Sequence, residues 1–388
     1  MTDYNKVNDD IIFDIEDAVS GNVYVGEEIN EDFFHDEMPI YGSGIPDVLV
    51  DVKSTEEVAA VVKICNENKI PVLARGAGSG LTGAGVAISQ GVMINMQPMN
   101  EILEYDEENM VVRVQPGVFL NELAEDCLAK GYLYPPDPGE KFATLGGNVA
   151  TNAGGMRAVK YGTTRDYVRS MEVVLPTSEI TNFGAVVSKS STGYDLKDLM
   201  VGSEGTLGII TELTLKIVPA PKATISLIVP FENLDECIST VPKLFKDNLN
   251  PQAIEFMERD IVLASEKYIG RETFPKNLDG IDANAYLLIT FDGDNEEELY
   301  EILERAAEIL VENGAIDCLV ADTPNAIKDA WAARSSFLEA IETQYELLDE
   351  CDVVVPITKI AEYVNFVNEE AKNYMFDVQS FGHAGDGN

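Results

Sequence analysis

The sequence predicts an α+β protein with two domains, and three observations carry this prediction. A strand–helix–strand order over residues 47–75 leads into a loop with five glycines in ten residues. Pro219-Ala-Pro221 then interrupts the chain, because proline fits neither a helix interior nor a central strand. Beyond it, two βαβ units follow each other, which predicts an antiparallel sheet covered by helices on one face. The 388 residues suffice for two domains with a hydrophobic core each.

The elements of the first half follow from hydrophobic periodicity and helix-start signals. Residues 2–45 are rich in acids, and Asp9 to Ala18 is predicted as a short helix. Ser54-Thr-Glu-Glu57 has the pattern of a helix start, and the apolar residues after it give this helix a buried face. A further helix is predicted at 121–130, and strands at 47–52, 70–74, 92–96, 111–114, 170–176 and 205–218.

The second half alternates regularly between the two kinds of element. Strands are predicted at 224–231, 253–257, 285–291, 316–321, 352–356 and 378–381. Helices are predicted at 234–245, 259–268, 296–313, 325–348 and 360–374. The resulting division is an acidic N-terminal arm at 1–45, a first domain at 46–221 and a second domain at 222–388.

Two glycine-rich stretches dominate the first domain. One runs from Gly76 to Gly85 and the other from Gly131 to Gly155, where Pro135, Pro136 and Pro138 predict a rigid turn. Glycine lets the backbone approach a ligand closely, and main-chain N–H groups bind phosphate oxygens. Short polar side chains are interleaved with the glycines of the second stretch. Together the stretches predict a site for a flat or phosphorylated ligand.

The upstream stretch contains Gly78-x-Gly80-x-x-Gly83, which has the spacing of a dinucleotide-binding motif. That motif requires a helix directly after the glycines. Here the residues after Gly85 predict a loop and then a strand. We therefore reject a Rossmann-type NAD site and predict a phosphate-binding loop of another fold.

Composition narrows the classes of function. The net charge of −41 excludes nucleic acid as a partner. Plain solubility, a salty cytoplasm and a basic partner all remain open as explanations of this charge. No window holds about 18 consecutive apolar residues, and the N-terminus lacks a signal segment, so we expect a cytoplasmic protein without a transmembrane segment. The five cysteines have no close pairing, which predicts free thiols and no iron–sulfur cluster in this chain.

Six motifs in order carry a resemblance to a known family. They are Arg75-Gly-Ala-Gly-Ser-Gly-Leu-Thr-Gly83, Pro135-Pro-Asp-Pro138, Leu145-Gly-Gly-Asn148, Thr151-Asn-Ala-Gly-Gly155, Tyr161-Gly-Thr-Thr-Arg-Asp166 and Gly202-Ser-Glu-Gly-Thr-Leu-Gly208. The chain from about Asp47 to Asn388 resembles the FAD-binding subunit of glycolate oxidase and related D-lactate dehydrogenases, which are vanillyl-alcohol-oxidase-type flavoproteins. The resemblance implies a two-subdomain FAD-binding domain followed by a ferredoxin-like α+β substrate domain.

The resemblance also implies which residues contact FAD. Because neither His nor Cys occurs in the motifs, the FAD is expected to be non-covalent. Phe142 and Ser178 depart from the family, which usually has a small residue and a glycine there. The implied FAD contacts are Arg75, Gly76, Ala77, Gly78, Ser79, Gly80, Thr82, Gly83, Pro136, Thr144, Gly147, Asn148, Thr151, Gly154, Gly155, Thr163, Asp166, Val168, Glu204, Gly208 and Ile209.

Two further motifs imply a substrate site. Ala330-Trp331-Ala-Ala-Arg334 matches a family helix whose arginine binds the substrate carboxylate, for which the guanidinium fork is well suited. The alternative is a surface salt bridge of Arg334 with Glu339 or Asp329. Phe381-Gly-His383-Ala-Gly-Asp-Gly-Asn388 matches the family's divalent-metal motif (zinc, iron or manganese), with His383 as a ligand. Only two histidines occur in the sequence, so we expect that a normal catalytic zinc set of three protein ligands cannot be assembled from this chain.

The leading expectation is an FAD-dependent dehydrogenase that oxidises D-lactate or glycolate by hydride transfer to flavin N5. An electron-transfer flavoprotein or an iron–sulfur subunit would accept the electrons. A D-2-hydroxyglutarate dehydrogenase, an ether-lipid synthase type with no net oxidation and a non-catalytic flavoprotein subunit remain open. In the family the chain continues after Asn388 with a second histidine and a glutamate. From this we expect a C-terminally truncated product with an incomplete metal site.

Overall fold

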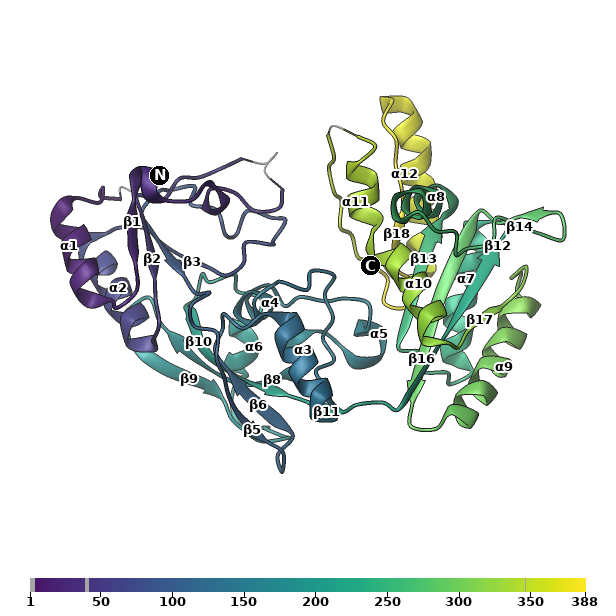
Figure 1. The fold of residues 1–388 in the computed structure, drawn as a ribbon, viewed down its shortest axis with the longest axis horizontal. Helices are drawn as coiled ribbons and strands as arrows, with labels where there is room; N and C mark the ends of the chain where they lie inside the picture. The colour runs from purple at the N-terminus through teal and green to yellow at the C-terminus, as the bar shows by residue number, and fades with distance from the viewer. Residues whose placement is uncertain (1–3, 39–41, 346) are drawn as a thin grey trace. The chain divides into compact units, whose positions relative to one another are not determined.

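The computed structural model describes residues 4–38, 42–345 and 347–388, which divide into two compact units (Figure 1). Unit 1 comprises residues 1–154 and 163–220, and unit 2 comprises residues 155–162 and 221–388. The chain therefore enters unit 2 briefly after Gly154, returns at Thr163, and leaves unit 1 again after Ala220. This last crossing adjoins the predicted domain limit at residue 221.

The first sheet of unit 1 has the strand order β1-β2-β4-β3, with β2, β4 and β3 parallel and β1 antiparallel at the edge. Its core holds the apolar face predicted for the helix after Ser54, and the Ser54 hydroxyl caps that helix by accepting from the N–H of Glu57. β3 leads into the first glycine stretch and then β4, which agrees with the rejection of a Rossmann site. The bounds are α1 (Asp9–Ala18), β1 (Val23–Val25), η1 (Gly26–Glu28), η2 (Glu31–Phe33), β2 (Val48–Asp51), α2 (Thr55–Asn68), β3 (Val72–Arg75) and β4 (Val92–Asn95).

The second sheet of unit 1 is antiparallel, with the order β5-β6-β10-β8-β9. Ser178 lies in the turn between β8 and β9 with a φ of 69°, a conformation that suits the family's glycine. The remaining bounds of unit 1 are β5 (Ile102–Asp106), β6 (Val111–Val114), α3 (Leu120–Ala129), β7 (Tyr132–Leu133), α4 (Leu145–Thr151), η4 (Thr164–Tyr167), β8 (Val168–Val174), β9 (Ile180–Gly184), α6 (Leu196–Met200), β10 (Ile209–Lys216) and β11 (Val218–Pro219).

Unit 2 has one large antiparallel sheet with the order β17-β12-β16-β13-β18 (Figure 1). The first four of these strands have the order of a ferredoxin-like fold, as the family resemblance implies. The bounds are α5 (Ala158–Tyr161), β12 (Ala223–Phe231), α7 (Leu234–Lys246), β13 (Ala253–Glu258), α8 (Arg259–Ile269), β14 (Asn277–Leu278), β15 (Ile281–Asp282), β16 (Ala285–Gly293), α9 (Glu296–Glu312), β17 (Leu319–Ala321), α10 (Pro324–Ser335), α11 (Phe337–Glu342), η5 (Ile357–Lys359), α12 (Ile360–Tyr374) and β18 (Phe381–His383).

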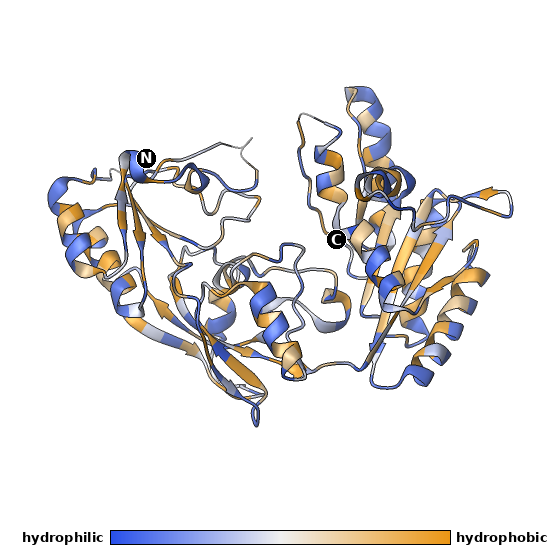
Figure 2. Cartoon of the chain, viewed as in Figure 1, coloured by the Kyte–Doolittle hydropathy of each residue, from blue (hydrophilic) through white to orange (hydrophobic). Residues whose placement is uncertain are grey.

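Helices pack on both faces of this sheet, so the prediction of a single covered face is wrong. Leu227 and Val229 of β12 face a core with α7, α9 and α12, whereas Ile228 faces a core with α8, α10 and α11. The central strands are mostly apolar and buried on both faces, since residues 225–231 of β12 and 285–292 of β16 are all buried, and orange predominates along them in Figure 2. Such continuous apolar runs are the sequence signal of a sheet buried on both sides.

Three predicted elements of unit 2 differ from the structure. The helix predicted at 325–348 is two helices that meet at Ser336, whose hydroxyl donates to the carbonyl of Ala333 and so competes with helical bonding. Residue 346, within that prediction, lies outside the described residues. Residues 352–356 form no strand, because Val355 pairs with the carbonyl of Gly387 in a loop. The last strand begins at Phe381 and not at 378.

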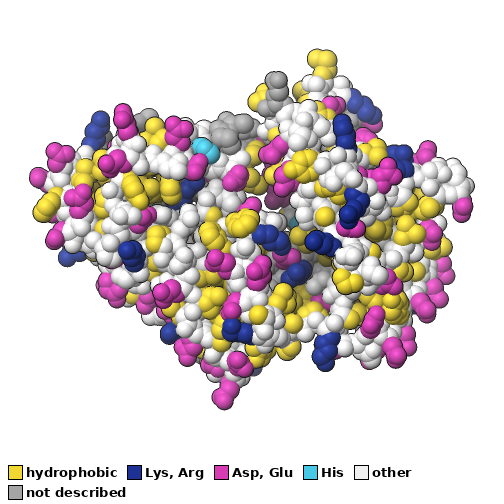
Figure 3. Space-filling view, viewed as in Figure 1, with side chains coloured by type: hydrophobic (Ala, Val, Ile, Leu, Met, Phe, Trp, Pro, Cys, Tyr) yellow, Lys and Arg dark blue, Asp and Glu magenta, His cyan; other side chains and the backbone are white. Residues whose placement is uncertain are grey.

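Across the described ranges, no helix is both long and apolar enough to cross a membrane. Acidic side chains are scattered over the visible face, as expected from the net charge (Figure 3). All five cysteines are free thiols, and Cys65, Cys127 and Cys237 are buried.

Candidate functional site

The two glycine stretches of unit 1 lie against each other. Gly76 directly follows β3, and a Cβ atom on Gly76 would lie 2.1 Å from Oγ1 of Thr144, the residue that caps α4. Gln97 fixes the same point, since its Nε2 donates to the carbonyl of Gly76 at 3.0 Å. The absence of a side chain at residue 76 therefore allows the two glycine stretches to pack directly against each other.

Arg75 supports the first glycine stretch from the protein side. Its Nη1 donates to the carbonyl of Gly85 at 2.8 Å, and its Nη2 donates to the carbonyls of Asp32 and His35 at 2.7 and 2.8 Å. A Cβ atom on Gly78, which has a φ of 80°, would lie 2.1 Å from this Nη2. The guanidinium of Arg75 thus binds protein carbonyls, and we expect the main chain of this stretch to make its ligand contacts.

The outer side of the first stretch is open. In the described part of the chain, the main-chain N–H groups of Ala77, Gly78 and Ser79 have no protein acceptor. A Cβ atom on Gly80 or Gly83 would meet no atom within 4 Å. Unpaired donors beside open space are what a phosphorylated ligand requires.

The second stretch offers a different surface. The first N–H groups of α4 are taken by the protein, since Leu145 donates to Val118 at 2.9 Å and Gly146 to Pro116 at 2.8 Å. However, Nδ2 of Asn148 is buried and has no hydrogen-bond partner among the described residues. A buried donor without a partner is unfavourable, so this atom fits a bound ligand that accepts from it.

The two remaining motifs attach to α4. Asn152 ends α4 in the left-handed conformation, and its Oδ1 accepts from Thr163 Oγ1 at 3.1 Å and from the Arg165 N–H at 2.9 Å. Glu204, with a φ of 51°, donates its N–H to the carbonyl of Ala150 at 2.8 Å. The two glycine stretches and these two motifs therefore meet around α4, and their residues fit a bound FAD.

The predicted contacts do not all face open space. Gly208 is required by packing, since a Cβ atom there would lie 2.5 Å from Cγ1 of Val173. Val168 and Ile209 are buried at the starts of β8 and β10, and Pro136 is also buried. Gly155 belongs to unit 2. The contacts that lie close to the open face or on exposed turns are Ala77, Ser79, Gly80, Thr82, Gly83, Gly147, Thr151, Gly154 and Asp166.

Glu255 of β13 joins the two predicted catalytic residues in unit 2. Arg334 of α10 donates to Glu255 Oε2 from Nε at 2.9 Å and pairs with the same oxygen from Nη2 at 2.8 Å. His383 of β18 is the cross-strand partner of Glu255, and its Nδ1 lies 2.7 Å from Oε1. The Glu255 side chain is fully buried. No motif marks this residue in the sequence, although a glutamate inside an apolar strand indicates a paired buried charge.

Arg334 is held in a defined orientation. Its guanidinium lies over the rings of Phe337 and Phe381, at 5.3 and 4.9 Å from their centroids. The residue is 9% exposed, and Asp329 pairs with Arg271 instead, so the alternative of a surface salt bridge with Asp329 is wrong. Within the described residues, Nη1 of Arg334 has no partner. The Nη1–Nη2 edge is therefore available to a carboxylate.

His383 is polarised by its surroundings. Burial lowers the pKa of His383, but the charge and hydrogen bond of Glu255 raise it more strongly, so the net direction is upward. Burial raises the pKa of nearby Asp386, and His383 opposes this shift. With Nδ1–H donated to Glu255, Nε2 of His383 is the atom left to accept a proton.

The described residues do not form a metal site by themselves. They contain no group of three His, Cys, Asp or Glu side chains placed to hold a metal ion. The role of His383 as a metal ligand stays a prediction.

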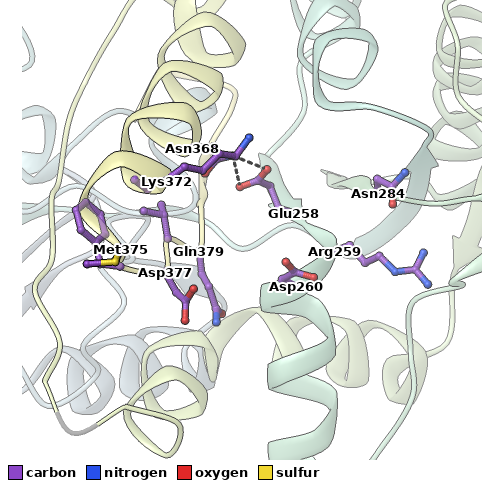
Figure 4. A pocket seen from close by; sticks show the side chains of 12 residues that line it. Glu258, Arg259, Asp260, Asn284, Asn368, Lys372, Met375, Asp377 and Gln379 are labelled. Carbon is purple, nitrogen blue, oxygen red and sulfur yellow. Dashed lines mark hydrogen bonds between the residues drawn. The ribbon is translucent and has the colours of Figure 1, made fainter.

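A cavity of about 620 Å³ opens where β13 ends and α8 begins (Figure 4). Asn368 of α12 points toward Glu258 there and donates to its carboxylate at 3.1 Å. Burial raises the pKa of Glu258, although its hydrogen bonds to Asn368 and Ser380 oppose this shift. Neither Arg334 nor His383 lines this cavity, so it is distinct from the candidate site.

Comparison with known proteins shows which families this architecture matches. Residues 46–184 match the FAD binding domain, and residues 220–388 match the C-terminal domain of FAD linked oxidases. The chain is 62% identical to a D-lactate dehydrogenase of Anaerostipes hadrus, covering 99% of this chain and 81% of the relative. It is 37% identical to the glycolate oxidase subunit GlcD of Bacillus subtilis, covering 92% of this chain and 74% of that protein.

A solved alkyldihydroxyacetonephosphate synthase has the same fold, with a TM-score of 0.75 and 22% identity over 96% of this chain and 76% of that one. At this identity the likeness concerns the fold alone. The chain belongs to the FAD-linked oxidase family. It is an FAD-dependent oxidoreductase, as its open glycine stretch and the matched domains together require.

Proposed function

We propose that this enzyme oxidises a small 2-hydroxy acid, D-lactate or glycolate, to the 2-oxo acid. The observation that carries the proposal is that the carboxylate of Glu255 binds both Arg334 and His383 and so orients both side chains. The relatives named D-lactate dehydrogenase and glycolate oxidase subunit support it. Bound FAD supplies the oxidant, since flavin N5 accepts a hydride from the carbon that bears the hydroxyl.

Each of the three side chains has a separate task. Nη1 and the second N–H of Nη2 of Arg334 bind the substrate carboxylate bidentately and so fix the reacting carbon. His383 Nε2 takes the hydroxyl proton as the hydride leaves, which balances the two-electron oxidation. Glu255 keeps Nδ1 of His383 protonated and stabilises the imidazolium that forms.

The FAD-contacting residues are also part of the proposal. We assign the phosphate contacts to the open main chain at Ala77, Gly78 and Ser79, and an orienting hydrogen bond to Asn148 Nδ2. We also propose that residues 46–221 form the FAD-binding domain and that residues 222–388 form the substrate domain. A short substrate is favoured over D-2-hydroxyglutarate, because the residues after Arg334, Ser335-Ser-Phe-Leu338, offer no basic side chain for a second carboxylate.

An electron acceptor completes the cycle. A separate electron-transfer flavoprotein or iron–sulfur protein is the partner we propose, and a basic contact surface would suit the acidic surface of this chain. The free thiols favour a reducing compartment, which supports a cytoplasmic location.

The test is an anaerobic titration of the FAD-loaded protein, followed by flavin absorbance. D-lactate or glycolate should bleach the flavin, whereas L-lactate should bleach it poorly. Stronger bleaching by D-2-hydroxyglutarate would replace the short-substrate assignment. If none of these acids bleaches a flavin that dithionite does reduce, the proposed oxidation is wrong.

A further inference from the structure

The chain crosses briefly into unit 2 between two groups of the proposed FAD contacts. Residues 155–162 carry the single helical turn α5 and lie wholly in unit 2. The chain on either side, at Gly154 and at Thr163, belongs to unit 1 and carries proposed FAD contacts. Any restraint on α5 therefore acts on both of these FAD loops through the covalent chain.

One end of α5 is anchored by a buried carboxylate. Asp292 of β16 has a fully buried side chain that forms an ion pair with Lys160. Tyr161 donates its hydroxyl to Asp292 Oδ2 at 2.6 Å. Lys160 Nζ also lies 3.3 Å from the main-chain carbonyl of Asp292. Two side chains of a four-residue helix thus converge on one acceptor residue.

The same turn contacts the loop that carries His383. A Cβ atom on Gly385 would lie 2.7 Å from Cγ2 of Val159, so glycine is required there for α5 to approach. The Gly385 N–H donates to the carbonyl of Ile254, next to Glu255, at 3.2 Å. The position of α5 is therefore linked by direct contact to the strand and loop that hold the proposed proton acceptor.

We propose that Asp292 is a positioning residue for hydride transfer. It binds Lys160 and Tyr161, and through them it keeps α5 in contact with the Gly385 loop. This one anchor therefore restrains α5, the FAD loops joined to it, and the loop that carries His383. This inference rests on the proposed function. Because a misplacement of about 1 Å can slow a reaction by about 100-fold, loosening this anchor should affect the chemical step more than binding.

The variants Tyr161→Phe and Asp292→Asn test the anchor in the FAD-loaded full chain. Tyr300→Phe is the matched control, since it removes a similar tyrosine–aspartate hydrogen bond, to Asp322 at 2.9 Å, on a helix outside the candidate site. We expect the limiting rate of flavin reduction by D-lactate to fall about 10- to 100-fold in Tyr161→Phe and Asp292→Asn, with the half-saturating concentration changed by less than about 3-fold. Tyr300→Phe should match the wild type in both quantities.

A second readout does not depend on turnover. The visible circular dichroism of bound FAD should change in Tyr161→Phe and Asp292→Asn but not in Tyr300→Phe, because it reports the surroundings of the ring. If Asp292→Asn fails to fold, Tyr161→Phe decides alone. Wild-type rates and wild-type dichroism in Tyr161→Phe would overturn the positioning role. If no 2-hydroxy acid reduces the wild type, the proposed function fails separately, and the dichroism alone then decides for or against the anchor.

Discussion

Glu255 and His383 face each other across β13 and β18, with Nδ1 of His383 2.7 Å from Oε1 of Glu255. The antiparallel register makes them direct neighbours, so the strand pairing itself aims the imidazole. Arg334 reaches the same carboxylate from α10. One buried charge therefore orients both a carboxylate-binding group and a proton acceptor.

Replacement of Glu255 by Gln tests this arrangement. The amide keeps the size of the side chain but cannot stabilise the imidazolium or pair with Arg334, so the rate of flavin reduction should fall by about 10²- to 10⁴-fold. Stability should fall too, by about 3–5 kcal/mol, because Arg334 is left buried without its partner. Stopped-flow reduction and denaturant unfolding measure the two effects.

Glu258→Gln is the control for Glu255→Gln, since it removes a part-buried carboxylate from the same strand outside the candidate site. It should reduce at the wild-type rate. Equal rates for the wild type and Glu255→Gln would remove Glu255 from the reaction.

Arg334→Lys should weaken turnover of the 2-hydroxy acid far more than FAD binding. Lysine keeps the charge but loses the planar fork, both toward Glu255 and toward the substrate. We expect kcat/KM to fall by at least about 100-fold, which corresponds to about 2.7 kcal/mol. Steady-state kinetics and an FAD titration measure the two quantities. Unchanged kinetics would show that Arg334 does not bind the substrate.

Gly80→Ala separates a ligand-facing glycine from a structural one. A methyl group at residue 80 meets no protein atom within 4 Å, so the fold should be unaffected while FAD affinity falls about 10-fold or more through a clash with the ligand. Gly139→Ala also enters open space, lies outside the proposed FAD contacts, and should bind FAD as the wild type does. Equal FAD affinities for Gly80→Ala and Gly139→Ala would contradict the assignment of this open face to FAD.

Periodicity predicted the alternating strands and helices of unit 2, whereas its ferredoxin-like strand order was implied by the family resemblance. Helix α4 escaped prediction because Gly146 and Gly147 have low helix propensity and tertiary contacts decide its conformation. Local patterns identified Arg334 and His383 but not Glu255, whose role depends on a strand pairing of residues far apart in the chain. For the same reason, the anchor of α5 on Asp292 follows only from the three-dimensional structure.

Non-covalent attachment predicts that acid precipitation releases the flavin. The six glycine and turn motifs contain neither His nor Cys, so they offer no side chain of the usual kind for a covalent bond. Yellow flavin should appear in the supernatant after precipitation and centrifugation. Flavin that stays in the protein pellet after washing would show a covalent bond.

The last prediction concerns pH and Glu258. Burial is the largest cause of its shift, and the pKa of Glu258 is raised from 4.5 despite the bonds from Asn368 and Ser380. The folded protein therefore binds a proton at Glu258 more tightly than the unfolded chain, and ionisation favours unfolding. Relative to Glu258→Gln, the wild type should lose stability as pH rises from about 4.5 through the raised pKa, with a constant difference above it.

Melting temperatures of the wild type and Glu258→Gln, measured from pH 4.5 to pH 8, check this. Contributions that the two proteins share cancel in the difference, which therefore reports the effect of this carboxyl group. The melting temperature of Glu258→Gln minus that of the wild type should grow with pH and then level off. A difference that shrinks as pH rises would mean that Glu258 is stabilised in its charged form, by Asn368 or by the start of α8, and that burial is the weaker influence.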